Sequence, residues 1–89
     1  LTDKSLKSLE KMLETKNYAI TAGTPEESGE NEFSKKEKKQ GLKPEHSFAL
    51  TKIDEKFVYL VDPVSNKKIK LSKEEFKNDF QTFTALKLQ

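Results

Sequence analysis

Apolar side chains near the N-terminus recur with the period of a helix. Three leucines and a methionine lie three or four residues apart over residues 3 to 15, so they share one face of an amphipathic helix. Thr2 or Asp3 is the expected N-cap. Residues 18 to 22 are rich in β-prone side chains and end at a Gly-Thr-Pro sequence, which indicates a short strand.

Two further apolar runs, residues 48–53 and 57–61, are separated by a short polar segment. This pattern predicts an antiparallel hairpin with residues 54–56 as its loop. A three-residue loop places Ile53 opposite Phe57, whereas a two-residue loop would turn one strand over relative to the other.

The C-terminal third combines a strand pattern with a clear helix start. Residues 67–71 alternate polar and apolar side chains, as a half-buried strand does. Ser72 and Glu75 then form a capping box, which predicts a helix over residues 73–79. Residues 81–88 alternate again and predict a final strand.

Residues 25 to 43 contain hardly any apolar side chain except Phe33, with acidic residues gathered over 26–32 and lysines over 35–39. Such a composition buries too little apolar surface to offset the entropy of ordering the chain. We therefore expect a mobile loop at about residues 25–43, and we interpret its charges as solvated rather than as a docking site.

The elements together predict an α+β fold, with an antiparallel sheet of about five short strands packed with two helices. Residues 1–89 form a single domain or a fragment. The chain starts inside a helical pattern, so we expect it to be a piece of a longer protein.

Composition restricts the classes of partner and site. The 89 residues carry a net charge of +2 with charges of both signs interspersed, so nucleic acid is not an expected partner. The apolar runs are far too short to span a membrane, so a membrane is not an expected partner either. The lysines at 67, 68 and 70 fit a solvated edge strand better than an anion site. One histidine, no cysteine and no calcium-loop or phosphate-loop spacing predict no metal site and no cofactor.

The one histidine, His46, and the aspartate Asp62 fall at the open end of the predicted hairpin. In the register of a three-residue loop they share a face of the sheet, one diagonal apart. A carboxylate beside a histidine is the orienting half of a nucleophilic triad, because it fixes the tautomer of the ring and stabilises the imidazolium. The same pair also fits a purely structural role.

Three short motifs follow one another along the chain, GL with HSFAL, VYLVDP, and LSKEEFKNDF. In this order, between an N-terminal helix and a closing strand, they resemble the C-terminal, histidine-bearing half of a calpain-type, papain-like cysteine peptidase domain. The resemblance implies the β-rich subdomain of that fold, with His46 as general base and Asp62 as the residue that orients it.

The sequence departs from the family pattern in three ways. The family usually has asparagine where this chain has Asp62, and tryptophan where it has Val64. The family's cysteine nucleophile and its oxyanion-hole donors lie in a preceding helical subdomain, and these 89 residues contain no cysteine. The resemblance therefore implies half of an active site.

Two interpretations remain open. In one, the chain is the base-bearing half of a calpain-like peptidase, inactive until an upstream cysteine-bearing subdomain completes it, and its partners are that subdomain or a protein substrate. In the other, it is a non-catalytic protein-interaction module. The first predicts an exposed apolar surface around His46, Phe48 or Tyr18. The oligomeric state is not indicated.

Overall fold

Five antiparallel strands form one sheet in the order β4-β3-β2-β1-β5. The structure is a computed structural model that describes residues 1–26 and 32–88. Within these residues the elements are α1 (Asp3–Thr15), β1 (Tyr18–Gly23), α2 (Lys35–Gln40), β2 (Ser47–Ile53), β3 (Phe57–Val61), β4 (Lys68–Ser72), α3 (Lys73–Asp79) and β5 (Thr82–Lys87). The predicted α+β class with a five-stranded antiparallel sheet is confirmed.

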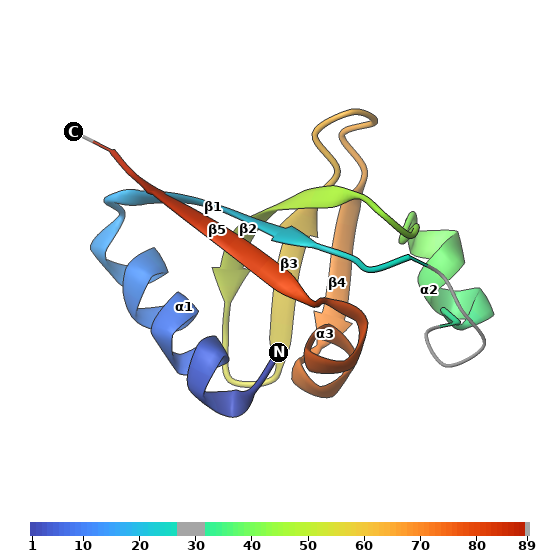
Figure 1. Ribbon diagram of the computed structural model, residues 1–89, viewed down its shortest axis with the longest axis horizontal. Helices are drawn as coiled ribbons and strands as arrows, with labels where there is room; N and C mark the ends of the chain where they lie inside the picture. Colours follow the sequence, from blue (N-terminus) through green and yellow to red (C-terminus); the bar gives the residue numbers. More distant parts are fainter. Residues whose placement is uncertain (27–31, 89) are drawn as a thin grey trace.

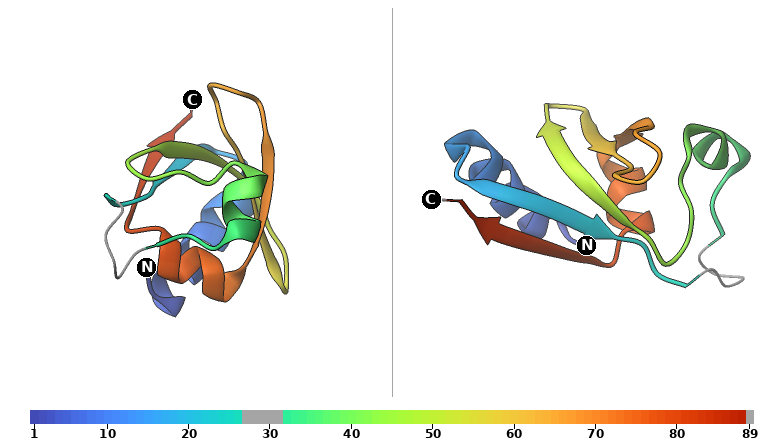
Figure 2. Two further views of the ribbon diagram at one scale, coloured as in Figure 1. Left: turned by 90° about the vertical axis from the view of Figure 1, so that its right-hand side faces the viewer. Right: turned by 90° about the horizontal axis from the view of Figure 1, so that it is seen from above.

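Helices α1 and α3 cover the same face of the sheet (Figure 1). Because side chains alternate between the two faces of a strand, every second strand residue points under these helices. The core lies in this layer, and its largest fully buried apolar side chains are Phe48, Phe76, Phe80, Leu9, Leu60, Ile69, Leu71 and Val58. The opposite face of the sheet carries no helix in the described part of the chain (Figure 2).

Both expected helices form where the sequence predicts them. The Thr2 side chain caps α1 by accepting the Ser5 N–H. The capping box of Ser72 and Glu75 starts α3. The apolar period was therefore sufficient to place α1, and the capping box to place α3.

A third helix, α2, lies inside the segment predicted to be a loop, so that prediction is wrong for residues 35–40, while its residues 27–31 lie outside the described part of the chain. Ser34 and Glu37 form a second capping box, and the helix ends at Gly41 with φ 110°. Phe33 and Leu42 are buried on either side of it. These two apolar side chains anchor α2 near the end of the sheet where β1 ends and β2 begins (Figures 1 and 2).

The hairpin of β2 and β3 has its predicted register only away from the turn. Ile53 lies opposite Val58, not opposite Phe57 as a three-residue loop requires. A β-bulge directly after Leu50 takes up one residue, so that Leu50 faces Leu60 as predicted. The longer turn shifts the register by one residue and the bulge shifts it back, so the predicted register holds at the open end of the hairpin.

Helix α3 carries the chain across the core face from one edge of the sheet to the other. It starts at the end of β4 and leads to β5, which pairs with β1. The Phe76 and Phe80 rings stack at 4.9 Å, and Phe80 also contacts the ring of Phe48 edge-on. This aromatic cluster supports the end of β2 that carries the candidate site.

The turn between β2 and β3 is organised by Asp54. Its carboxylate accepts the N–H groups of Lys56 and Phe57 at 2.9 and 2.7 Å, and the Tyr59 hydroxyl at 2.8 Å. The Phe57 N–H has the largest effect, followed by Lys56 and Tyr59, and together they lower the pKa of Asp54 to about 2.

This low pKa makes the fold sensitive to acid. Because the pKa of Asp54 is lower when folded than its unfolded value of about 3.9, the ionised carboxylate stabilises the fold above about pH 4. The stabilisation is lost as the pH falls through about 2. We expect Asp54→Asn to be less stable than the parent at pH 7, with the difference shrinking towards pH 2. Denaturant unfolding at pH 7, 4 and 2 measures it, and a difference independent of pH would contradict the assignment.

Candidate functional site

The sheet register brings His46 and Asp62 together. Ala49 faces Val61, so the next position outward, Phe48, faces Asp62. His46 lies two residues before Phe48 and therefore on the same face, one diagonal away from Asp62. This is the face that the helices cover, and the predicted placement of the pair is confirmed.

The two side chains are in direct contact. The His46 Nε2 atom lies 2.9 Å from the Asp62 Oδ1 atom. The Asp62 side chain is 1% exposed and that of His46 is 22% exposed, so the carboxylate is covered while one part of the ring faces solvent. The ring of Phe48 packs edge-on against the imidazole at 4.8 Å, which limits its rotation.

The Asp62 carboxylate has two further partners. Its Oδ1 atom also accepts the Val64 N–H at 2.9 Å, and its Oδ2 atom lies 3.2 Å from the Lys43 ammonium. The hydrogen bond from His46 is the main cause that holds the pKa of Asp62 well below its usual value. Burial opposes this effect, and the Val64 N–H and Lys43 lower the pKa further. Asp62 is therefore ionised at neutral pH.

An ionised carboxylate only accepts hydrogen bonds, so the proton shared with Asp62 belongs to Nε2 of His46. A neutral ring in this tautomer carries its lone pair on Nδ1. Among the hydrogen bonds of the described residues, none involves Nδ1. Nδ1, the nitrogen that could accept a proton, therefore has no hydrogen-bond partner among the described residues, whereas Nε2 is held by Asp62.

Comparison of the chain with protein-family models, curated proteins and solved structures finds no match.

Sequence reasoning missed two residues of the site. Lys43 holds the second oxygen of Asp62, and Thr24 binds the backbone of His46 on both sides, through its N–H and its hydroxyl. A lysine three residues before the histidine gives no specific signal, because exposed lysines are common. Thr24 has a weak signal, since it belongs to the Gly-Thr-Pro sequence that ends the predicted strand.

The prediction of an exposed apolar surface around His46, Phe48 or Tyr18 is wrong for the two apolar residues that it names. Phe48 is fully buried and Tyr18 is half-buried, so neither provides it. The large apolar side chain that is exposed beside the carboxylate is Val64, at 79%. It stands where the resembled family has tryptophan.

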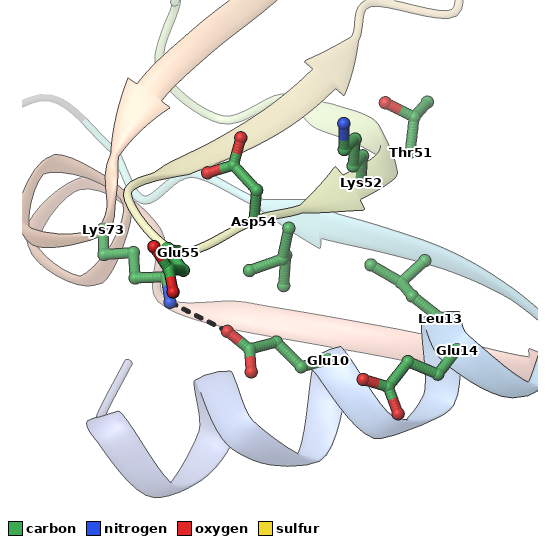
Figure 3. Close-up of a pocket in the computed structure, with 9 residues that line it drawn as sticks. Glu10, Leu13, Glu14, Thr51, Lys52, Asp54, Glu55 and Lys73 are labelled. Atoms are coloured by element: carbon green, nitrogen blue, oxygen red, sulfur yellow. Dashed lines mark hydrogen bonds and ion pairs between the residues drawn. The ribbon is translucent and has the colours of Figure 1, made fainter.

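The hollow drawn in Figure 3 has a volume of about 410 Å³ and is lined from α1, β2, the hairpin turn and the start of α3. Three of its six charged residues have partners within the fold, since Lys73 pairs with Glu10 at 2.9 Å and Asp54 has the three hydrogen bonds given above. Its lining residues are not those of the His46 and Asp62 pair, so this hollow is separate from the candidate site.

Two other features are absent from the described residues. They contain no group of three or more histidine, cysteine, aspartate or glutamate side chains placed to hold a metal ion. None of their helices has both the length and the apolar character needed to cross a membrane.

Proposed function

We propose that the chain is the base-bearing half of a calpain-like cysteine peptidase. The observation that carries the proposal is the 2.9 Å contact between His46 Nε2 and Asp62 Oδ1, with the carboxylate buried and the ring partly exposed. A ring held in this way has the tautomer that a general base needs. The order of motifs and elements along the chain supports the same reading.

In this mechanism Nδ1 of His46 takes the proton of a cysteine thiol supplied by an upstream subdomain. The thiolate attacks the scissile carbonyl carbon, and the imidazolium then gives its proton to the leaving amine. Asp62 stabilises the imidazolium and holds the ring plane throughout. Because these 89 residues contain no cysteine, the chain alone is inactive in this proposal.

The alternative is a non-catalytic protein-interaction module, and one observation favours it. Asp62 also has a structural role, because it accepts the Val64 N–H and its backbone closes the turn through bonds to Asn66 and Lys67. Buried carboxylates with such bonds occur in folds that have no activity. In that case His46 only satisfies the carboxylate.

Hydrolysis of a fluorogenic peptide library separates the two functions. We expect no turnover by the 89-residue chain, and turnover sensitive to iodoacetamide by the product of the whole reading frame, whose upstream part should contain a cysteine at the start of a helix. A whole product without such a cysteine, or without thiol-dependent hydrolysis, would favour the interaction module. Turnover by the 89 residues alone would mean that the assigned chemistry is wrong.

A further inference from the structure

The Thr24 side chain binds both ends of the loop that carries Lys43 and His46. Its hydroxyl donates to the Lys43 carbonyl oxygen at 2.7 Å and accepts the His46 N–H at 3.0 Å. The Thr24 N–H donates to the His46 carbonyl oxygen at 3.0 Å. Thr24 is 8% exposed, so these bonds are shielded from water and hold the loop onto the end of β1.

Lys43 and His46 are also the two residues whose side chains contact the carboxylate of Asp62. Lys43 Nζ lies 3.2 Å from Oδ2, and His46 Nε2 lies 2.9 Å from Oδ1. The Thr24 hydroxyl therefore binds the backbone of the same two residues, Lys43 and His46, whose side chains contact the Asp62 carboxylate. A shift of the loop would move both away from Asp62 together.

The loop needs external support because its own conformation is unfavourable. Glu45, directly before His46, has φ 47°, a left-handed conformation that non-glycine residues adopt rarely. Pro44 has no N–H to contribute. The Glu45 N–H donates to the Pro25 carbonyl oxygen at 3.1 Å, so the support again comes from the segment that follows β1.

We propose that Thr24 is a positioning residue, whose hydroxyl sets His46 and Lys43 on the two oxygens of Asp62. The effect on the ring is a property of the chain itself, and only its catalytic consequence rests on the proposed function. If Thr24 were merely structural, its loss would lower stability without changing the contact between the ring and the carboxylate.

The test uses the 89-residue chain with Thr24→Val, which removes the hydroxyl and keeps the branched shape, and Thr24→Ser, which keeps the hydroxyl. The readout is the exchange rate of the Nε2 proton with water, from ¹H–¹⁵N spectra of the imidazole. We expect exchange to accelerate about fivefold to tenfold in Thr24→Val, as the net strength of a hydrogen bond allows. Thr24→Ser should return the rate to within about twofold of the parent.

Thr51→Val is the matched control. The Thr51 hydroxyl also donates to a backbone carbonyl oxygen, that of Tyr59 at 3.1 Å, but within the hairpin and away from Asp62. This variant should leave the imidazole spectrum unchanged. Thr24→Ala removes the same hydroxyl without adding a methyl group in its place, and it replaces Thr24→Val if the valine variant does not fold.

Two results would overturn the proposal. One is an unchanged Nε2 exchange rate in a folded Thr24→Val or Thr24→Ala variant, which would reduce Thr24 to a structural link. The other is a serine variant that behaves like valine, because the hydroxyl would then not be the cause. The spectra do not depend on turnover, so a failure of the peptidase proposal would show in the hydrolysis assay and leave this result standing.

Discussion

Replacing Leu9 with alanine is expected to lower the free energy of unfolding by about 2 to 5 kcal/mol. Leu9 on α1 is fully buried in the layer between helix and sheet. Its truncation removes apolar contacts and leaves a cavity that surrounding side chains fill only in part. A domain of this size has a total stability on the order of 5 to 10 kcal/mol, so the change is a large fraction of it.

Leu86→Ala is the matched control, because the same atoms are removed from a side chain that is 65% exposed on β5. Its effect should stay within about 0.5 kcal/mol. Urea unfolding of both variants, followed by circular dichroism, measures the two values. Similar losses in both would mean that α1 does not pack on the sheet as described.

The helix boundaries show where sequence reasoning works. Ser72 and Glu75 satisfy each other's backbone donors within four residues, so the signal is local and needs no tertiary context. Ser34 and Glu37 have the same spacing, and the sequence could have predicted α2 from them. The surrounding run of charged residues concealed this signal, because composition favoured a loop.

The predicted register of the hairpin is correct near His46 and Asp62, although the predicted length of the turn is wrong. The turn is longer than the predicted three residues, since Ile53 pairs with Val58, and the bulge after Leu50 restores the alternation. A bulge depends on twist and packing across the sheet, and no residue type in β2 marks it. The face shared by His46 and Asp62 could therefore be predicted, but the path of the strand between them could not.

The strand order and the surroundings of the pair depend on contacts between distant parts of the chain. β5 reaches β1 after α3 crosses the core face, where Phe80 meets Phe48. Lys43 and Thr24 reach the site through a loop conformation with a left-handed residue. Neither arrangement leaves a periodic pattern, so the sequence predicted the pair and not the residues that support it.

Under the proposed peptidase function, Asp62→Ala is expected to lower kcat/KM by on the order of 10²- to 10⁴-fold, the range for loss of an oriented general base. The variant removes the acceptor of the His46 Nε2 proton and the partner of Lys43. The ring can then adopt either tautomer and can rotate away from the cysteine. The rate is measured on the product of the whole reading frame.

Asp62→Asn separates orientation from charge. The amide oxygen can still accept the Nε2 proton, and the resembled family usually has asparagine at this position, so we expect most of the activity to be kept. The Lys43 ammonium lies 3.2 Å from Oδ2 of Asp62 and offsets the charge of the carboxylate. The Asp62 and Lys43 pair is therefore similar in net charge to an asparagine. Lys43 also holds the Oδ2 atom of Asp62 in place, so Lys43→Met should reduce kcat/KM when Asp62 is present and have little effect in the Asp62→Asn background.

Asp54→Ala is the control, because it removes another carboxylate of lowered pKa, in the turn between β2 and β3. It should leave kcat/KM of the folded protein unchanged. Full activity in Asp62→Ala would contradict the catalytic role of the pair and favour the interaction module. Equal losses in Asp62→Ala and Asp62→Asn would instead show that the negative charge itself is needed. The site would then work as an aspartate triad in which the carboxylate stabilises the imidazolium, and the similarity to the asparagine of calpain-type enzymes would not extend to mechanism.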